Sequence, residues 1–402
     1  MKRTRVSAID VGTTKVCTIM GDIDEKNNVR ILGVGVAPSK GLAKGMVVNL
    51  NEARESIRDS VRIAERTAGY KLESAYVGVT GRHVSSVNNK GAIAISRNDR
   101  LVKPEDLKRV LEVARTIEVP NDQKVLHVIP RAYSVDGQEG VKNPVGMHGF
   151  RLDVETHVIT AAVTSVQNLT KCIRSIGIEI DDLILEPLAS AEAVLAPEER
   201  LDGVLLADIG GSTTDIAVFK DNSICYTSIL PVGGYQISRD ISIGLGLPFE
   251  AAEDMKKKYG NITPVGNAEG VEDRTINYGQ QTLSANDLND IVRARVDELI
   301  RLIVMEIPDK DFQHYIPSGL VMTGGGANLT GIVDSARDIT GFPVRLGTPI
   351  NLPGVSDALY DPAYATSVGL MLWRSRNHNA QTPHAHGGIR GLMSPVLRLI
   401  RH

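Results

Sequence analysis

The sequence predicts an α/β protein of two related lobes, because one short pattern occurs twice, about half a chain apart. The first copy is Ile9-Asp10-Val11-Gly12-Thr13-Thr14-Lys15, and the second is Ala207-Asp208-Ile209-Gly210-Gly211-Ser212-Thr213-Thr214-Asp215. In each copy an apolar run leads into an aspartate, a glycine follows, and hydroxyl residues precede a second β-rich run. Two such strand–turn–strand hairpins predict two lobes that face each other across a cleft.

Composition places the chain among ordinary globular proteins. Its 402 residues are 42% hydrophobic and 23% charged, which is enough for a large core and two or more domains. The net charge of −3 gives no reason to expect a nucleic-acid partner. The three cysteines form no CxxC pair, so we expect a reducing compartment and no zinc site. We expect neither a signal peptide nor a membrane-spanning run.

Strand signals open the first lobe. Residues 5–20 and 29–36 have the composition of strands, and a polar turn at 22–28 separates them. Residues 76–79 predict a further strand of the same lobe. Both hairpin strands are rich in valine and isoleucine, as buried strands are.

A helix is predicted between these strands, from Asn51 as its N-cap to Ala68. Gly69 is placed to end it, since glycine adopts the left-handed conformation that closes many helices. Its apolar residues recur every three or four positions and so form one face. That face consists of Ala53, Ile57, Val61 and Ala64.

The pattern changes between residues 83 and 165, which we interpret as an inserted module. Ala92 to Ile95 predict a short strand, and Pro104 opens a helix. Residues 125–135 and 156–164 predict two further strands. The apolar face of the helix consists of Leu107, Val110, Leu111, Ala114 and Ile117.

The second lobe begins with Val204 to Ala207, a continuous apolar run that predicts a strand buried on both faces. Residues 231–305 are mostly helical in pattern, with a looser polar stretch at 260–283. Residues 320–376 return to an alternation of strand, glycine and helix. This order again predicts an α/β lobe.

The two hairpins have the composition of phosphate-binding turns. Glycine lets the backbone approach a phosphate closely, and neighbouring N–H and hydroxyl groups donate to its oxygens. Lys15 adds a charge suited to a β- or γ-phosphate, and Asp10 and Asp208 would hold a hydrated Mg²⁺ between the lobes. For one hairpin alone, a tight β-turn is the alternative. The predicted phosphate-binding residues are Asp10, Gly12, Thr13, Thr14, Lys15, Gly210, Gly211, Ser212 and Thr213.

A third element follows both hairpins. The apolar residues Val321 and Met322 lead through Thr323 into Gly324-Gly325-Gly326-Ala327-Asn328. Bare glycine backbone would accept an adenine or ribose, so we assign Gly324, Gly325, Gly326 and Asn328 to the nucleotide. No GxxxxGK[ST] motif is present, which excludes a P-loop.

This order of two hairpins and a glycine-rich loop resembles the actin/Hsp70/sugar-kinase superfamily. The resemblance implies an actin-like two-lobed ATPase fold with ATP and Mg²⁺ as ligands. Residues 186–191 and 362–370 resemble the connectors between the lobes, with Gly369 at a close helix contact. Within the superfamily, residues 5–375 and the tail resemble the FtsA family of bacterial cell-division proteins. The most specific segments are 233–241, 252–256 and 361–366.

The resemblance also implies a domain division. The expected parts are a first lobe core (1A) at 1–82, 166–200 and 345–376; an inserted small α+β subdomain (1C) at 83–165, in place of actin's usual second subdomain; a second lobe core (2A) at 201–231 and 301–344; a small subdomain (2B) at 232–300; a linker at 377–387; and an amphipathic membrane-targeting helix at 388–402.

Residue roles are carried over in the same way. Gly234, Glu253 and Lys256 would contact the nucleoside, with the last two on one helix face; a surface ion pair is the alternative. Glu186 would orient the attacking water, although it could simply be a helix N-terminal residue before Pro187. Asp208 and Thr214 are further catalytic candidates near the γ-phosphate. We expect at most a slow Mg²⁺-dependent ATPase.

The tail carries a second signal, one apolar helical face with positive charge. So short a helix is marginal in water and would fold against an apolar surface, for which an anionic membrane is the natural candidate. Docking on its own domain or on a protein partner is the alternative. The expected membrane-contacting residues are Ile389, Leu392, Met393, Val396, Leu397, Ile400, Arg390, Arg398 and Arg401.

The resemblance therefore implies a protein on the cytoplasmic face of the membrane at the division site. It would polymerise with itself, bind the C-terminal tail of FtsZ, tether the FtsZ ring and recruit later division proteins. One alternative is a type IV pilus assembly adaptor of the same fold, which needs no amphipathic tail. Another is a small-molecule kinase, which needs an acceptor pocket for which the sequence offers no obvious loop.

Overall fold

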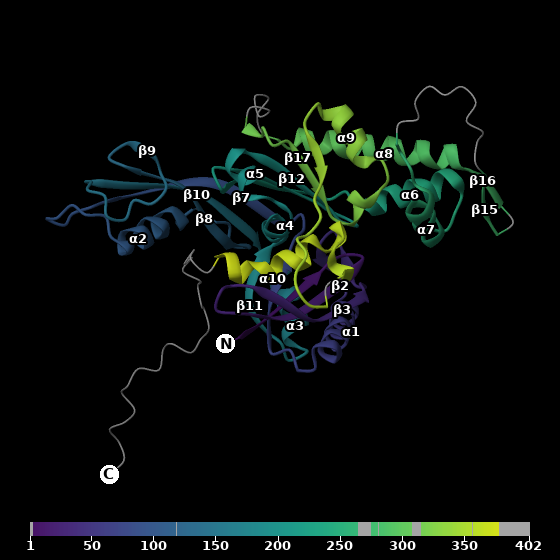
Figure 1. Ribbon diagram of the computed structural model, residues 1–402, viewed down its shortest axis with the longest axis horizontal. Helices are drawn as coiled ribbons and strands as arrows, with labels where there is room; N and C mark the ends of the chain where they lie inside the picture. Colours follow the sequence, from purple (N-terminus) through teal and green to yellow (C-terminus); the bar gives the residue numbers. More distant parts are fainter. Residues whose placement is uncertain are drawn as a thin grey trace, which may run out of the picture.

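The computed structural model describes residues 3–117, 119–263, 275–279, 281–307, 315–355 and 357–377. Two five-stranded sheets form two lobes, and a four-stranded sheet projects from one end of the molecule (Figure 1). A small helical part with a two-stranded hairpin lies at the opposite end. The α/β prediction is confirmed.

The first lobe is built on a sheet of order β11-β6-β1-β2-β3. The first three strands in chain order pair antiparallel, whereas β6 and β11 run parallel to β1. A short β4–β5 hairpin follows β3. The strands are β1 Thr4–Val11, β2 Lys15–Ile23, β3 Val29–Pro38, β4 Leu42–Ala43, β5 Met46–Val47, β6 Ser74–Val79 and β11 Glu179–Leu185. The helices are α1 Leu50–Ala68, α3 Val163–Arg174, α4 Glu186–Val194 and α10 Ala365–Asn377.

The second lobe repeats this topology, with the order β14-β13-β12-β17-β18. Again three antiparallel strands are followed by two parallel ones, so the two copies of the sequence pattern occupy equivalent hairpins. Every residue of β12 is buried, as its continuous apolar run predicts. The elements are α5 Pro197–Asp202, β12 Val204–Ile209, β13 Thr214–Lys220, β14 Ser223–Leu230, β17 Leu320–Thr323, η2 Gly325–Asn328, α9 Ile332–Thr340, β18 Val344–Leu346, η3 Asp357–Leu359 and η4 Pro362–Tyr364.

The ends and the buried face of helix α1 follow from residues within and next to the helix. Its predicted apolar face is buried and Gly69 ends it in the left-handed conformation, at φ 77°. The predicted N-cap Asn51 is wrong, because the Asn49 side chain accepts hydrogen bonds from the backbone N–H groups of Asn51 and Glu52. The N-cap therefore lies two residues earlier than predicted, and the helix begins at Leu50.

The inserted sheet has the order β7-β10-β8-β9 and carries one helix. It begins five residues after β6 and returns the chain directly to α3. Val110 and Ala114 of the helix are buried against the sheet. The elements are β7 Val84–Ala94, α2 Pro104–Arg115, β8 Gln123–Val135, β9 Gln138–Val141 and β10 Arg151–Ala162.

The small part of the second lobe is mostly helical, as predicted, and adds one hairpin. Ser284 caps the start of helix α8, since its hydroxyl accepts from the Asp287 N–H. Its apolar face packs on α6 and α7. The elements are α6 Gly234–Leu245, α7 Phe249–Tyr259, β15 Thr275–Tyr278, β16 Gln281–Ser284 and α8 Ala285–Met305.

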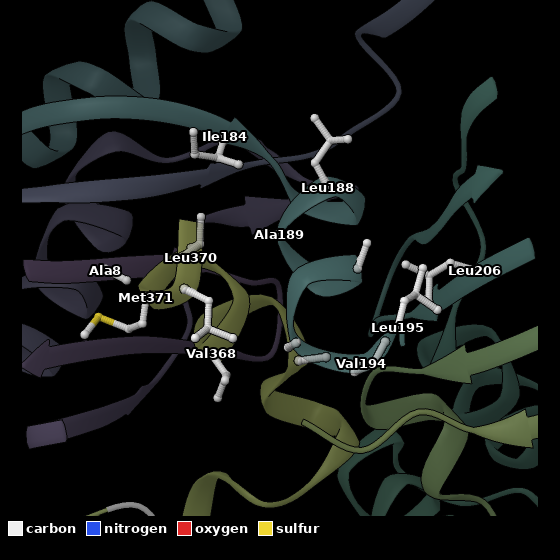
Figure 2. Close-up of a cluster of buried hydrophobic side chains, with 14 of the residues drawn as sticks. Ala8, Ile184, Leu188, Ala189, Val194, Leu195, Leu206, Val368, Leu370 and Met371 are labelled. Atoms are coloured by element: carbon white, nitrogen blue, oxygen red, sulfur yellow. The ribbon is translucent and has the colours of Figure 1, made fainter. Parts of the chain in front are cut away.

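One continuous core joins the lobes, because α4 and α10 cross between the two sheets. Figure 2 shows side chains of β1, α4, α10 and β12 gathered around this crossing. The helices meet at Gly369, where an added Cβ would lie 1.7 Å from the carbonyl oxygen of Ala189. Only glycine permits this approach, so the prediction of a close helix contact at Gly369 is confirmed.

Among the described residues the three cysteines are free thiols. No described helix has both the length and the apolar character that a membrane crossing requires. The linker at 377–387 lies outside the described residues apart from Asn377, which ends α10, and the tail helix at 388–402 lies wholly outside them.

Candidate functional site

A cavity of about 550 Å³ lies between the lobes and is lined by both hairpins. The structure brings most of the predicted site residues to this one place. Those that line the cavity are Asp10, Gly12, Thr13, Thr14, Lys15, Glu186, Asp208, Gly210, Gly211, Thr213, Gly234, Glu253, Lys256, Gly324, Gly325, Gly326 and Asn328. Ser212 and Thr214 are the predicted cleft residues that do not line it.

The hairpin turns touch each other across the cleft. The hydroxyls of Thr13 and Ser212 are 2.7 Å apart and share a hydrogen bond. Beside them, a Cβ added to Gly211 would lie 2.5 Å from Cγ2 of Thr14. The glycine is therefore needed for the present separation of the lobes.

Lys15 reaches from the first hairpin to the segment that precedes α10. Its Nζ donates to the carbonyl oxygen of Ala363 at 2.7 Å and lies 4.4 Å from the centre of the Tyr364 ring. A carbonyl and an aromatic face both stabilise an ammonium group. The charge is thereby held at the cavity wall, beside Asp10 and Asp208 in the cavity lining.

Two aspartates, one from each lobe, are held by the first turn of α10. Ser367 donates to Oδ2 of Asp10 at 2.6 Å, and Thr366 donates to Oδ2 of Asp208 at 3.0 Å. Ser190 of α4 also donates to Asp208. Burial raises the pKa of both carboxyls, and these hydrogen bonds and Lys15 oppose that shift.

The donor set fits a hydrated Mg²⁺. The hydrogen bonds of both aspartates go to Oδ2, which leaves Oδ1 of each for the water shell of a cation. Magnesium prefers such a site of few carboxylates and several waters. Within the described ranges, no group of three or more His, Cys, Asp and Glu side chains has metal-binding geometry.

Thr214 does not face the cavity, contrary to the prediction of a role near the γ-phosphate. Its side chain is buried and donates to the carbonyl oxygen of Val232 at 2.8 Å. Because side chains alternate along a strand, the next residue of β13, Asp215, faces the cavity instead.

Asp215 and Thr80 are cavity-lining residues that the sequence prediction missed. The Thr80 hydroxyl donates to Oδ1 of Asp215, which joins the first lobe to the second. Burial, with the charge of Asp208, raises the pKa of Asp215 to about 8. Asp215 ends the second hairpin pattern in the sequence, one residue after Thr214.

Glu186 is the first residue of α4 and is buried at the cavity wall. Burial raises its pKa well above the usual value, and the charges of Asp10, Asp215 and Asp208 raise it further. A carboxyl with a raised pKa is a better base near neutral pH than an exposed one. Glu186 is therefore both the first residue of a helix and a candidate base at the cavity wall.

Glu253 and Lys256 form a partly buried ion pair of 2.7 Å on α7. Nζ of Lys256 also donates to the Gly234 carbonyl at 2.9 Å, so the pair is fastened to the start of α6. The side chains are 16% and 13% exposed, which distinguishes them from the surface ion pair considered as the alternative. Both line the cavity on the side of the second lobe.

The glycine-rich loop closes the remaining side. Gly324 has φ 83°, and an added Cβ would lie 2.3 Å from Oδ1 of Asp208. At the end of the loop the Asn328 amide donates to Asp361 at 2.8 Å. Asp361 also accepts from the Ala363 N–H and so orients the segment that holds Lys15.

The comparisons with known proteins agree on one family. The profile described as "Cell division protein FtsA" matches residues 205–369, and the one described as "SHS2 domain inserted in FTSA" matches residues 81–160. The cell division protein FtsA of Pseudomonas aeruginosa is 40% identical over 371 residues, which cover 92% of this chain and 88% of that protein. The chain belongs to the FtsA family.

Other FtsA proteins are similar over the same length. FtsA of Bacillus subtilis is 37% identical over 93% of this chain and 84% of its own. FtsA of Escherichia coli K12 is 33% identical over 94% of this chain and 91% of its own. The similarity therefore covers both lobes and the inserted sheet, and this is a cell division protein by family.

Solved structures establish the fold. A chain of the PilM–PilN type IV pilus biogenesis complex has a TM-score of 0.65 at 17% identity, over 93% of this chain and 99% of that one. MreB5 of Spiroplasma citri bound to AMPPNP has a TM-score of 0.56 at 14% identity, over 94% and 97%. The actin-like fold predicted for this FtsA-family chain is confirmed.

Proposed function

We propose that this FtsA-family protein binds MgATP between its lobes and polymerises on the cytoplasmic face of the membrane at the division site. There it tethers the FtsZ ring and recruits later division proteins. The observation that carries the proposal is the convergence of two phosphate-type hairpins, two aspartates and a glycine-rich loop on one cavity. Family membership supports the division role and favours it over the pilus-adaptor and kinase alternatives.

ATP would lie with its phosphates between the hairpin turns. Lys15 would then exchange the Ala363 carbonyl for a phosphate oxygen, and Mg²⁺ with its waters would lie between Asp10 and Asp208. The adenosine would reach the Glu253–Lys256 pair and the Gly324–Gly326 backbone. When bound, Mg²⁺ would neutralise part of the negative charge of the phosphates. Hydrolysis would be slow and would serve to switch the polymer state.

The membrane part of the proposal rests on the tail sequence. Its apolar face and its Arg390, Arg398 and Arg401 suit an anionic surface, where each arginine contributes about 1 kcal/mol. One short helix binds weakly, so several copies held in a polymer would bind together. Family membership supports self-association as the source of those copies.

For the FtsZ tail we propose the exposed side of α8. Of the two arginines of this helix, Arg293 and Arg295, the second is already engaged, since it donates to Asp240 and Glu298 at 2.5 Å each. Arg293 forms no ion pair with any described residue and is therefore the better contact for an acidic peptide. The measurement is binding of a labelled FtsZ C-terminal peptide to Arg293→Glu and Arg295→Glu.

The membrane tether is tested by co-sedimentation with anionic vesicles, with and without MgATP. We compare the full chain with a version that ends at His386, and Leu397→Asp with Ser394→Asp. Leu397→Asp places a negative charge on the apolar face, and Ser394→Asp places the same charge outside it. We expect only the full chain and Ser394→Asp to sediment, and to sediment more with MgATP.

If the truncated chain sediments as well as the full chain, the tail is not the anchor and the proposal fails. The same holds if neither sediments while ATP still binds. ATP binding is measured separately by calorimetry, with Lys15→Ala as the test variant and Lys71→Ala, an exposed lysine of the first lobe, as the control. Loss of a charged hydrogen bond predicts roughly 10- to 100-fold weaker binding for Lys15→Ala.

A further inference from the structure

Glu186 lies between two cavities. It lines the large cavity between the lobes and also a second one of about 10 Å³ behind it, inside the first lobe. None of the described residues offers its carboxyl a hydrogen bond that would lower its raised pKa. Water in one of these cavities is therefore the partner available to the carboxyl.

The second cavity is small, and both polar and apolar groups form its wall. Its volume is at the lower end of what one water molecule requires. Besides Glu186, the polar side chains that line it are those of His83, Thr80 and Ser165. The apolar part comes from β6, the β4–β5 hairpin and α3.

His83 lies in the loop between β6 and β7. Gly81 has φ 128°, and an added Cβ would lie 2.9 Å from Nδ1 of the imidazole, so the loop backbone packs against the ring. The carbonyl of His83 accepts from the Ala162 N–H at 3.2 Å, which fixes the residue to the start of α3.

The imidazole of His83 lacks partners within the described part of the chain. Both ring nitrogens are buried and neither makes a hydrogen bond. Burial lowers the pKa of His83, so the ring is neutral at pH 7 and has one N–H donor and one acceptor nitrogen. A single water in this cavity would bond one ring nitrogen of His83, Ser165 and Glu186, since buried waters make about three hydrogen bonds.

We propose that His83 is a positioning residue for ATP hydrolysis, acting on Glu186 through one water held in the small cavity. This inference rests on the proposed nucleotide function. Attack of a second water on the γ-phosphorus breaks the bond to the β–γ bridging oxygen and yields ADP, phosphate and one proton. Glu186 takes that proton from the attacking water, while the held water, hydrogen-bonded to His83, keeps the Glu186 carboxyl in place.

His83 does not line the large cavity. We therefore expect its replacement to change the rate of ATP turnover and to leave the affinity for ATP nearly unchanged. His83→Leu is expected to lower the single-turnover rate of phosphate release about 10- to 100-fold, the lower part of the range for acid–base groups. The Kd for ATP should stay within twofold. His83→Gln keeps a donor and an acceptor and should recover part of the rate. His148→Leu, an exposed histidine of the inserted sheet, is the control.

A double-mutant cycle tests whether His83 acts on the reaction through Glu186. Glu186→Gln should abolish most turnover, and the double variant Glu186→Gln/His83→Leu should lose no more than Glu186→Gln alone. A full further loss in the double variant would overturn the inference. So would a wild-type rate in His83→Leu, or an equal loss in His83→Gln and His83→Leu.

Failure of the proposed function gives a different result. If the wild-type chain binds ATP but releases no phosphate, the inference about His83 is overturned while nucleotide binding stands. If the wild-type chain binds no ATP, the nucleotide part of the proposed function is overturned as well. ATP affinity and melting temperature of each variant show whether it is folded.

Discussion

The Thr80 hydroxyl donates a hydrogen bond to the Asp215 carboxyl across the cleft. Thr80 follows β6 of the first lobe and Asp215 belongs to β13 of the second, so the bond closes the floor of the cavity. Asp215 is only 3% exposed, and burial is the main reason that its pKa rises to about 8. The lobes are thus joined by a carboxyl that costs free energy to ionise.

Asp215→Asn should stabilise the folded protein at alkaline pH. Between the ordinary pKa of 3.8 and about 8, the folded state binds more protons than the unfolded state, so the free energy of unfolding falls as pH rises. Asparagine keeps an acceptor for Thr80 and carries no charge. We expect its melting temperature to exceed the wild-type value most at pH 8.5 and less at pH 5. Asp59→Asn, exposed on α1, should show no such trend.

Gly211→Ala should force the hairpin turns apart. The added Cβ meets Cγ2 of Thr14 at 2.5 Å, and such overpacking costs about 1–3 kcal/mol. We expect ATP affinity to fall roughly tenfold. Thr14→Ser removes Cγ2, so the double variant should regain most of the affinity. A double variant as weak as Gly211→Ala alone would count against a steric cause.

Gly369→Ala should destabilise the junction of the lobes. The added methyl would lie 1.7 Å from a backbone oxygen of Ala189, so α4 and α10 must separate and open the core shown in Figure 2. The expected loss is about 3 kcal/mol or more in urea unfolding. Gly325→Ala meets only the Ala363 methyl, at 3.6 Å, and is the control. An equal loss in both would contradict the packing argument.

His157 ties the inserted sheet to the second lobe and makes stability depend on pH. Its ring nitrogens lie 2.7 Å from Asn88 Oδ1 and 3.0 Å from Thr227 Oγ1, and burial, with the charge of Arg131, lowers its pKa to about 4. Below the ordinary pKa of 6.5 the unfolded state binds more protons, so stability falls from pH 6.5 toward pH 4.

The expected slope is at most about 1.4 kcal/mol per pH unit from this group. His157→Gln does not titrate, so its free energy of unfolding should fall less over the same interval. The measurement is urea unfolding at pH 6.5 and 5.0. His148→Gln, exposed on the inserted sheet, should keep the wild-type slope. An unchanged slope in His157→Gln would exclude this histidine as the cause.

Helices and strands that depend on residues close together in the chain could be predicted from the sequence. The buried face of α1 and its end at Gly69 follow from periodicity and from the conformational freedom of glycine. The continuous apolar run of β12 predicted burial on both faces. The N-cap was misplaced, because Asn49 and Asn51 have the same chemistry and only the backbone path decides which one caps the helix.

The site could be predicted in outline for a similar reason. Glycines, hydroxyls and aspartates at the ends of two hairpins must meet if the lobes are related and face each other, and most of them line one cavity. Thr214 and Asp215 show what could not be predicted about the site from the sequence. Both are polar neighbours on one strand, and the sequence contains no signal for which of them faces the cavity.

By itself, the sequence determined the repeated hairpins and the residue types available for phosphate and metal, because these depend on local propensity and order along the chain. Its resemblance to the actin/Hsp70/sugar-kinase superfamily implied the actin-like fold. Only the tertiary structure decided which side chains meet. Ser367 reaches Asp10, Thr80 reaches Asp215, and His83 shares a small cavity with Glu186. Such pairs are far apart in the chain, and their contact depends on how α4 and α10 pack between the two sheets.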